Sequence, residues 1–462
     1  MSLPADHFAT LGAPILSVGE MRDAEQALFD AGIEPFALMQ RAGEAAAEFI
    51  WRVGSRRETL VLCGPGNNGG DGFIIADCLR ALGLPVRVAA LGESSTQSSR
   101  RARAQWGGAV EDVMAASPAP QIVDALFGIG LTRGLEPALV KALAELVDAA
   151  QHSFAIDVPS GVESDLGVVL SPVPRFTHCI ALGAWKPAHM LAQSRACADI
   201  HYLADIGIEA PDGCARAMPR PSLSAPAADA HKYRRGLVCV VAGTMPGAAA
   251  LSAEAAAHSG AGYVRLVGAQ ADISHAIVCS AALDFDKAKA VLVGPGLCRD
   301  DGAWMRLRDV TGASVPVVAD ADALWHLAQR GVDALPAPAI ITPHEGEFAA
   351  LFGEGAGNKI DRTRAAAVQI GSMIVHKGPD TVVAAPDGRC VVAPPASSWL
   401  STAGTGDVLA GLCAGRLAVT GDPFRAACEA VWLHGEAARR SGAAFTADDL
   451  VGRISQSFGS AL

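Results

Sequence analysis

One glycine-rich segment in the first half of the chain combines a flexible backbone with polar side chains. It reads Gly64-Pro65-Gly66-Asn67-Asn68-Gly69-Gly70-Asp71-Gly72, and it follows an apolar strand and opens a helix. Glycines here let backbone N–H groups approach a pyrophosphate, and the helix N-terminus favours the same anion. The Asn and Asp side chains offer oxygens to a cation or to ribose hydroxyls. A tight strand-to-helix turn without a ligand is the alternative interpretation.

Two further polar segments follow apolar strands in the same half, at Val123–Gly134 and Ala155–Gly161. Ligands of a parallel sheet collect at the carboxyl ends of its strands, so we expect these loops to meet the glycine-rich segment there. Asp124 or Asp157 alone could equally be a helix cap or a turn residue. The convergence of the loops favours a functional role for both.

In the second half, Ser401-Thr402-Ala403-Gly404-Thr405-Gly406-Asp407 opens a helix that we expect over Val408–Leu417. Glycines at a helix start expose unpaired N–H groups, which can form an anion hole for a transferring phosphoryl group. An aspartate in the first turn can take a proton from an attacking hydroxyl. The alternative is an ordinary N-cap on a core helix.

Elements of an α/β fold surround these loops. A capping box at Ser17–Glu20 starts one helix, and a second helix begins at about Pro35. A helix at Phe73–Leu82 separates two strands, which indicates a parallel sheet. The strands expected in this half are Thr59–Cys63, Val86–Leu91, Ile122–Leu126, Phe154–Val158 and Cys179–Leu182.

The alternation breaks between Cys214 and Ala230, where Pro219, Pro221 and Pro226 stand among Ser and Ala. We interpret this stretch as an interdomain linker and predict domains at 1–217 and 231–462, joined by 218–230. After a helix at Ala248–His258, strands alternate with helices again. The strands expected are Leu237–Ala242, Tyr263–Val267, Ala290–Val293, Val315–Ala319, Ala339–Ile341, Met373–His376 and Thr381–Ala384.

Composition narrows the class of protein. The chain has 462 residues, half of them hydrophobic, but its apolar stretches are broken before the roughly 18 residues of a membrane span. A net charge of −11 without a basic run argues against a nucleic-acid partner. The 11 cysteines are widely spaced, which is typical of reduced thiols. The N-terminus lacks a basic patch and an apolar core, so we expect no signal peptide and a cytoplasmic location. We also expect a homo-oligomer that binds neither nucleic acid nor membrane.

The segments Gly64–Gly72, Asp124–Gly134 and Asp157–Gly161 closely resemble the YjeF N-terminal domain, the NAD(P)H-hydrate epimerase. The resemblance covers most of residues 15–215, including Leu38–Gly43. It implies a Rossmann-like three-layer domain with a K⁺ ion. The implied substrate, NAD(P)HX, is NADH or NADPH with water added across the nicotinamide C5–C6 double bond. The enzyme interconverts its R and S configurations at C6.

The resemblance also implies roles for residues of this chain. Asp157 is the implied catalytic residue at the reacting end of the substrate, where a carboxylate can move the proton that inversion requires. Asn68, Asp124 and Ser160 would coordinate K⁺. Besides Asp157, the implied substrate-binding residues are Asn67, Asn68, Gly69, Gly70, Asp71, Gly128, Ile129, Gly130, Leu131, Thr132, Arg133 and Gly134.

The Gly-Thr-Gly-Asp pattern of the second half resembles the ribokinase-like superfamily. Six further segments support this pattern. Together with it, they make residues 225–460 closely resemble the ADP- or ATP-dependent NAD(P)H-hydrate dehydratase. Singly, Asp320 and Asp322 could be caps and His344 a structural histidine. Ser397–Leu400 departs from the smaller residues expected before the loop. The supporting segments are His231–Tyr233, Met245–Ala248, Gly294–Leu297, Asp320–Leu324, Thr342–Phe348 and Lys377–Thr381.

The second resemblance implies that Asp407 is the catalytic base. The C6 hydroxyl would be phosphorylated and phosphate would then leave, since phosphate is a far better leaving group than hydroxide. Mg²⁺ is expected to bridge the phosphates of ADP or ATP. Ala248, Gly296, His344 and Asp407 would hold the hydrate. The adenine nucleotide would be held by Lys377, Gly378, Pro379, Asp380, Thr381 and Gly406.

The sequence therefore predicts a Rossmann-like epimerase domain followed by a ribokinase-like dehydratase domain, which together repair hydrated nicotinamide cofactors. One alternative is a small-molecule kinase fused to a nonenzymatic nucleotide-binding module. It rests only on the Gly-Thr-Gly-Asp loop and does not explain Asn67–Asp71. Another treats the first domain as a scaffold, against which the presence of Asn68, Asp124, Asp157 and Ser160 argues.

Overall fold

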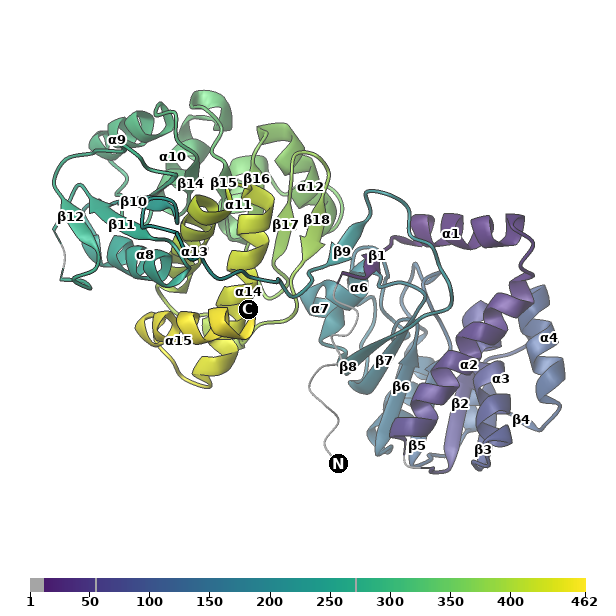
Figure 1. Cartoon of the computed structure of the whole chain (residues 1–462). Coiled ribbons are helices and arrows are strands. Elements are labelled where there is room, and N and C mark those ends of the chain that lie inside the picture. The colour runs from purple at the N-terminus through teal and green to yellow at the C-terminus, as the bar shows by residue number, and fades with distance from the viewer. Residues whose placement is uncertain (1–11, 55, 271) are drawn as a thin grey trace. The chain divides into compact units, whose positions relative to one another are not determined.

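The computed structural model of the chain describes residues 12–54, 56–270 and 272–462 (Figure 1). The chain divides into two compact units, Met1–Ala217 and Met218–Leu462. Part of the segment expected as a linker belongs to the core of the second unit. Met218 and Leu223 are buried there, and their N–H groups donate to Val392 O (2.8 Å) and Ala461 O (2.8 Å).

A fully parallel sheet forms the centre of the first unit, with strand order β4-β3-β2-β5-β6-β7-β8. All five residues of the central strand β2 are buried, as expected for a strand covered on both faces. The strands are β2 (Thr59–Cys63), β3 (Val86–Ala90), β4 (Val110–Asp112), β5 (Gln121–Ala125), β6 (His152–Ile156), β7 (Phe176–Leu182) and β8 (Ala198–Ala204). A short antiparallel pair, β1 (Pro14–Ile15) and β9 (Ala215–Ala217), completes the unit.

Helices cover both faces of this sheet, so the unit has three layers. Val61 and Cys63 pack with α2 and α3 in one cluster, whereas Leu60 and Leu62 pack with α5 in another. Successive strand residues point to opposite faces, which explains the division. The helices are α1 (Val18–Asp30), α2 (Pro35–Val53), α3 (Asn67–Ala81), α4 (Gln97–Trp106), α5 (Pro137–Asp148), α6 (Pro187–Met190), α7 (Ala192–Arg195) and the 3₁₀ turn η1 (Val113–Ala115).

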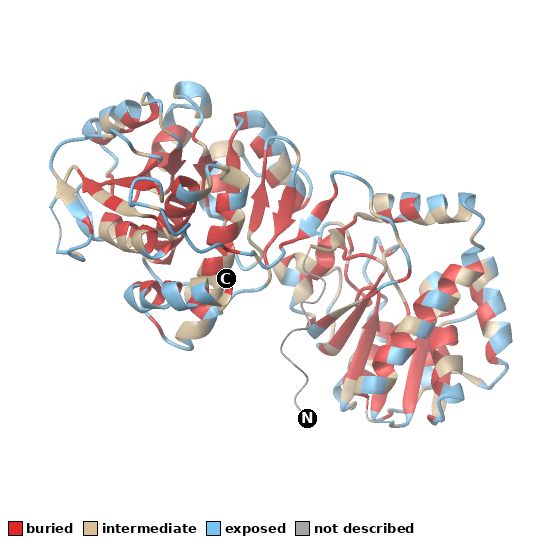
Figure 2. Cartoon of the chain, in the orientation of Figure 1, coloured by how far each residue is buried: buried red, intermediate tan, exposed pale blue. Residues whose placement is uncertain are grey.

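The sheet of the second unit has the strand order β18-β17-β16-β15-β14-β13-β10-β11-β12. It is parallel from β16 to β12 and antiparallel from β16 to β18. Its central strands are buried, whereas the edge strand β12 and the outer faces of the helices are exposed or partly exposed (Figure 2). The strands are β10 (Leu237–Val241), β11 (Tyr263–Val267), β12 (Val278–Ser280), β13 (Ala290–Val293), β14 (Val317–Ala319), β15 (Ile340–Ile341), β16 (Met373–His376), β17 (Val382–Ala384) and β18 (Cys390–Val392).

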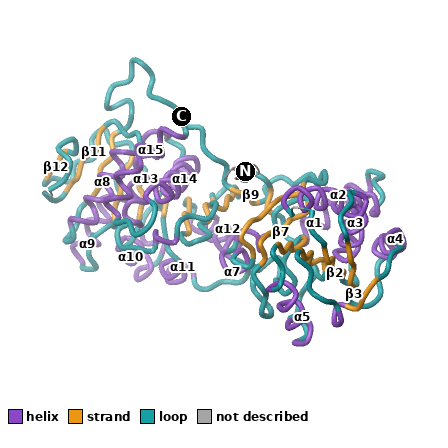
Figure 3. The backbone as a smooth tube through the Cα atoms, turned by 90° about the horizontal axis from the view of Figure 1, so that it is seen from below, coloured by secondary structure: helices purple, strands orange, loops and turns teal. Residues whose placement is uncertain are grey.

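Helices lie in two groups in the second unit. Figure 3 shows α9, α10 and α11 together, apart from α14 and α15. The helices are α8 (Pro246–His258), α9 (Asp301–Thr311), α10 (Asp322–Arg330), α11 (Glu345–Phe352), α12 (Lys359–Ile370), α13 (Thr405–Thr420), α14 (Pro423–Ser441) and α15 (Ala447–Ser460), with 3₁₀ turns η2 (Val332–Ala334) and η3 (Ser398–Leu400).

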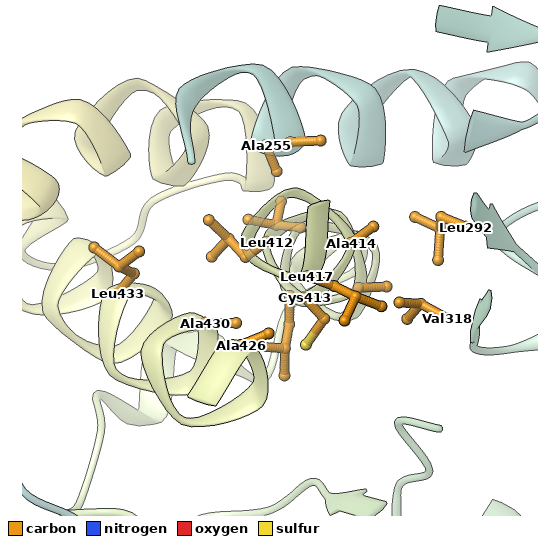
Figure 4. Close-up of a cluster of buried hydrophobic side chains, with 14 of the residues drawn as sticks. Ala255, Leu292, Val318, Leu412, Cys413, Ala414, Leu417, Ala426, Ala430 and Leu433 are labelled. Carbon is orange, nitrogen blue, oxygen red and sulfur yellow. The ribbon is translucent and has the colours of Figure 1, made fainter. Parts of the chain in front are cut away.

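Helix α13 is buried on nearly all sides and forms the centre of the second core. Leu412, Cys413 and Ala414 lie among side chains of α8, α14 and the sheet (Figure 4). A Cβ at Gly411 would lie 2.1 Å from Ser252 O, and a Cβ at Gly415 would lie 1.9 Å from Ser259 Oγ. Glycine at these two positions therefore permits the close approach of α8 and α13.

Within the described residues, no helix combines the length and apolar character that crossing a membrane requires. The eleven cysteines are free thiols, and several of them fill the cores. Both units are α/β and parallel at their centres, so the predicted fold class is confirmed.

Candidate active sites

The first candidate site lies where strands β2, β5 and β6 end, side by side in the sheet. Three loops meet there with very little space between their backbones. A Cβ at Gly64 would lie 1.7 Å from Leu126 O, and one at Gly69 would lie 1.8 Å from Gly64 O. Asn67–Asp71 form the first turn of α3, whose helix begins before the expected Phe73. Their backbone N–H groups therefore face the junction of the loops.

Asn68 is the residue of this turn that points into the junction. Its side-chain oxygen and nitrogen are both buried, and neither has a hydrogen-bond partner in the described part of the chain. A Cβ at Gly128 would lie 3.3 Å from Asn68 Cγ and 3.1 Å from Asp157 Oδ2. The three segments predicted from the sequence thus converge at one place.

Asp124 and Ser160 form a buried hydrogen-bonded pair beside this junction. Ser160 Oγ donates to Asp124 Oδ1 (2.8 Å), and Ser160 N–H donates to Asp124 Oδ2 (3.0 Å). Burial raises the pKa of Asp124 to about 6, although these bonds and the N–H of Leu126 oppose the shift. No cation pairs with the Asp124 carboxylate among the side chains that the structure describes.

Asp157 lies at the centre of the site in a left-handed backbone conformation, with φ of 64°. Its Oδ1 is 2.5 Å from the ammonium of Lys186, which has no solvent exposure and also donates to Leu182 O (2.7 Å). His189 fixes the position of both residues. Its Nδ1 accepts the N–H of Lys186 (2.9 Å), so its Nε2 donates to Asp157 O (2.6 Å).

Two more carboxyl groups share the environment of this ion pair. Burial, followed by repulsion from Asp157 and Glu25, raises the pKa of Asp71 well above its usual value. The pKa of Glu25, on α1, is also raised by burial and by Asp157. The site therefore holds carboxyl groups that differ in how readily they ionise.

Not every predicted substrate-binding residue faces this junction. The Leu131 side chain is buried in the cluster under α5, and Gly134 lies against Leu170 O. Asn67 is exposed and accepts a hydrogen bond from Thr96 Oγ1 (2.6 Å). Gly130, Thr132 and Arg133 are exposed on the loop that leads away from Ile129.

The second candidate site lies where β10, β13, β14, β15 and β16 end, in adjacent positions of the second sheet. Met245 N–H donates to Gly296 O (3.1 Å), so the loop before Ala248 contacts the Gly294–Leu297 loop. Gly296 has φ of +65°, and a Cβ there would lie 2.3 Å from Met245 O. Met245, three residues before Ala248, thereby contacts Gly296.

Lys377 connects the end of β16 with the start of α13. Its Nζ is 2.8 Å from Asp320 Oδ1 and 3.8 Å from Glu347 Oε2, and a Cβ at Gly406 would lie 3.5 Å from it. Although burial opposes ionisation, Asp320 and Glu347 raise the pKa of Lys377. A permanent positive charge thus lies beside the free N–H groups of the helix start.

Asp407 occupies the first turn of α13 at this point. Burial, and then repulsion from Asp320, raises its pKa to about 6, while Lys377 acts in the opposite direction. Its backbone carbonyl accepts the hydroxyl of Ser252 (2.8 Å), which connects α13 to α8. A carboxylate of this kind can accept a proton near neutral pH.

The remaining predicted residues have structural partners as well. His344 caps α11, because its Nδ1 accepts the N–H of Gly346 (3.0 Å). The rest of its side chain is exposed. The Asp380 carboxylate is 2.7 Å from Nζ of Lys359, whose side chain lies beneath Gly378. Thr381 Oγ1 closes the Gly378–Thr381 turn.

Comparison with known proteins covers both units. Residues 35–188 match the family model of the YjeF-related protein N-terminus, and residues 238–457 match that of NAD(P)H-hydrate dehydratase. A bifunctional NAD(P)H-hydrate repair enzyme from Salinibacter ruber is 35% identical over 502 residues, covering 93% of this chain and 92% of that protein. This chain belongs to the bifunctional NAD(P)H-hydrate repair enzyme family.

Other members of the NAD(P)H-hydrate repair family also match across both units. The protein from Mycobacterium tuberculosis (strain H37Rv) is 34% identical over 429 residues, covering 87% of this chain and 88% of that protein. A Bacillus subtilis ADP/ATP-dependent NAD(P)H-hydrate dehydratase, co-crystallised with ATP/Mg²⁺, is 27% identical. The match covers 52% of this chain and 95% of the Bacillus subtilis chain, with a TM-score of 0.44.

Three residues of this family member were not identified from the sequence. Lys186 follows β7 and stands before Pro187, and a lysine after a buried strand is the only signal that could have drawn attention to it. Glu25 looked like an ordinary residue of an amphipathic helix. Lys359 is the cation that pairs with Asp380, and it lies at the start of α12, which was not predicted from the sequence.

Proposed function

We propose that the first unit interconverts the R and S forms of NAD(P)HX and that the second unit dehydrates the S form with ADP or ATP. Membership of the family supports this pairing of activities. The alternative of a kinase fused to a nonenzymatic module is disfavoured, because full-length relatives named as bifunctional repair enzymes match both units. The observation that carries the proposal is the buried Asp157–Lys186 pair in one unit and Asp407 beside Lys377 in the other.

In the epimerase unit, inversion at C6 requires the C6 oxygen to leave and return, or the ring to open and close. Either route moves a proton at the C6 oxygen. Lys186 holds Asp157 in one position, and the raised pKa of Asp71 lets that carboxyl carry a proton. Asp157, held in place by Lys186, and Asp71 would together deliver and remove this proton.

The buried oxygen atoms beside Asp157 suit a K⁺ ion. Asn68 Oδ1 lacks a partner, Asp124 lacks a cation within the described ranges, and Ser160 adds a hydroxyl oxygen. All three are hard oxygen donors without a histidine or cysteine among them. These residues would hold K⁺, which would supply positive charge for the diphosphate of the substrate.

In the dehydratase unit, Asp407 would take the proton of the C6 hydroxyl as its oxygen attacks the terminal phosphorus of the nucleotide. The bond to the bridging oxygen then breaks, which releases AMP from ADP or ADP from ATP. The N–H groups of Gly404–Gly406 and the Lys377 ammonium stabilise the charge that develops on the phosphoryl oxygens. Phosphate then departs from C6 and a proton from C5, which restores the double bond.

Mg²⁺ would bind mainly through the phosphates of the nucleotide. Within the described ranges, no group of three or more His, Cys, Asp or Glu side chains could hold a metal ion by itself. A site made of nucleotide oxygens, waters and one or two carboxylates is the usual arrangement for Mg²⁺. Asp320 and Glu347, beside Lys377, are the carboxylates available.

To test this, the full-length chain is incubated with mixed R and S hydrate, Mg²⁺ and either ADP or ATP. The absorbance of the NADH or NADPH that forms is recorded over time. Complete recovery of the reduced cofactor needs both activities. Asp157→Asn should restore only the S fraction at the enzymatic rate. Asp407→Asn should lose at least ~100-fold in dehydration and keep R/S exchange, measured by chromatography. If Asp407→Asn dehydrates normally, the phosphorylation mechanism is wrong.

The homo-oligomeric state and the cytoplasmic location stay predictions, and size-exclusion chromatography with light scattering measures the first of them. The repair assay, run with each nucleotide and each hydrate, distinguishes ADP from ATP as phosphoryl donor and NADHX from NADPHX as substrate.

A further inference from the structure

A cleft of about 590 Å³ opens in the second unit, away from the residues assigned to dehydration. Its walls come from the 224–230 segment, the ends of α8 and α13, the start of α14, and α15. This volume is within the range of sites for small molecules. Neither candidate active site contributes a residue to its lining.

The cleft and the dehydratase site lie at opposite ends of the same two helices. Helix α8 begins at Pro246, beside Ala248, and reaches the cleft at His258. Helix α13 begins at Thr405, beside Asp407, and reaches the cleft at Thr420. A 16-residue helix is about 24 Å long, so the two sites are separate.

Positive charge is concentrated in the lining of this cleft. Four arginines and one histidine line it, namely Arg234, Arg235, Arg416, Arg425 and His258. No acidic side chain stands among the described lining residues. The whole chain carries a net charge of −11, so the charge of the cleft lining is opposite in sign to that of the chain.

Two of the arginines share a single buried carboxylate. Arg416 Nη2 and Arg425 Nε lie 2.5 Å and 2.7 Å from the two oxygens of Glu429, and Arg416 and Glu429 are each only 3% exposed. One carboxylate balances one charge, so this group of three keeps a positive charge at the wall of the cleft. Arg234, by contrast, is paired with the exposed Asp229.

Arg235 is the least satisfied of the four. Its Nη2 donates to Gly260 O (3.2 Å), but its Nε is buried and has no hydrogen-bond partner in the described part of the chain. It forms no ion pair with the side chains that the structure describes. The charge of the Arg235 guanidinium, which lines the cleft, is therefore not balanced by a carboxylate among the described residues.

We propose that this cleft binds a small molecule that carries a phosphate or diphosphate group. The planar guanidinium fork matches phosphate oxygens, and four guanidinium groups line the cleft. Ala225, Ala257 and Phe458 offer apolar contact to the rest of the ligand. This inference does not depend on the proposed repair function.

The experiment is calorimetric titration of the full-length chain with inorganic pyrophosphate and, separately, with ADP, in buffer without Mg²⁺. Lys377→Met removes the ammonium beside Gly406 and so lowers binding at the dehydratase site. The part of the remaining binding that is lost when a cleft residue is also changed is assigned to the cleft. Combining Lys377→Met with Arg235→Gln should weaken the remaining binding at least ~10-fold, since a charge-assisted contact is lost. Arg330→Gln, an exposed arginine paired with Asp301, is the matched control.

Val419→Glu provides a second test that removes no hydrogen bond. Val419 is exposed at the edge of the cleft, and a carboxylate there would repel an anion. Made alone, without Lys377→Met, Arg235→Gln and Val419→Glu should each keep wild-type dehydration, because neither residue belongs to that site. If pyrophosphate and ADP bind equally well to Lys377→Met with and without these changes, or do not bind to it at all, the cleft is not an anion site.

Discussion

The ammonium of Lys186 lies 2.5 Å from Oδ1 of Asp157, and both side chains are withdrawn from solvent at the end of β7 and β6. Breaking a buried pair by removing one partner leaves a charge without compensation. Lys186→Met should therefore destabilise the first unit by about 3–5 kcal/mol. Because Asp157 would also lose its fixed position, epimerisation should fall at least ~100-fold.

The measurement is urea unfolding together with R/S exchange. Lys186→Met combined with Asp157→Asn removes both charges and should recover part of the stability without the activity. Wild-type exchange in Lys186→Met would show that the lysine has no part in the reaction.

The pH profile of dehydration should report Asp407. Its pKa is raised to about 6 by burial and by Asp320, and the base must be unprotonated to accept the hydroxyl proton. The rate should therefore be level above about pH 7 and fall about tenfold per pH unit below about pH 6. Initial rates of kcat/KM on the S hydrate give this profile. A rate that stays level down to pH 5 would contradict the role of Asp407 as base.

Epimerisation should depend on a hard monovalent cation. Replacing KCl by tetramethylammonium chloride should slow R/S exchange in the wild type and lower the thermal stability of the first unit. In Asp124→Asn, exchange should be slow in both salts, because the amide cannot balance the charge of a cation. Dehydration serves as the internal control and should persist throughout. Equal exchange rates of the wild type in the two salts would remove K⁺ from the proposal.

The contact between α8 and α13 predicts a pair of opposite stability effects. Gly415→Ala places a Cβ 1.9 Å from Ser259 Oγ and should destabilise the second unit by about 1–3 kcal/mol. Gly435→Ala, in α14, meets only Ala396 Cβ at 3.7 Å and should stabilise it by about 0.5–1 kcal/mol through helix propensity. Chemical unfolding measures both. Equal effects would mean that the helices separate at little cost.

A fragment of the second unit should fold alone only if it begins early enough. Met218 (0% exposed) and Leu223 (4% exposed) belong to its core, so residues 218–462 should be markedly more stable than residues 225–462. The longer fragment should dehydrate the S hydrate and leave R/S exchange at its spontaneous rate. Thermal unfolding of the two fragments compares them directly, and identical midpoints would show that Met218 and Leu223 contribute nothing.

Local patterns were sufficient to predict the fold class and most of the central strands. Apolar runs such as Thr59–Cys63 and Met373–His376 are covered on both faces, and their bounds agree with the structure. The strands β4, β12 and β18 were missed, because each has only three residues. The start of α3 was placed too late, since glycines and asparagines are weak helix formers in isolation.

Site residues could be predicted where they lie in the loops at the ends of the strands. Asn68, Asp124, Asp157 and Ser160 follow strands that end side by side, and the structure brings them together. Partners from distant elements were not predictable in the same way. Lys186 reaches Asp157 across 29 positions of sequence, and a single lysine has no periodicity that could reveal its partner.

The backbone of Asp157, with φ of 64°, has a consequence for how substitutions there should be interpreted. Aspartate, asparagine and glycine enter this conformation readily, whereas alanine and β-branched residues do not. In a saturation library, expression level should therefore rank asparagine and glycine with the parent and the other residues below them. Catalytic output should single out aspartate alone. The two rankings separate the geometric demand on this position from the chemical one, and an alanine scan would merge them.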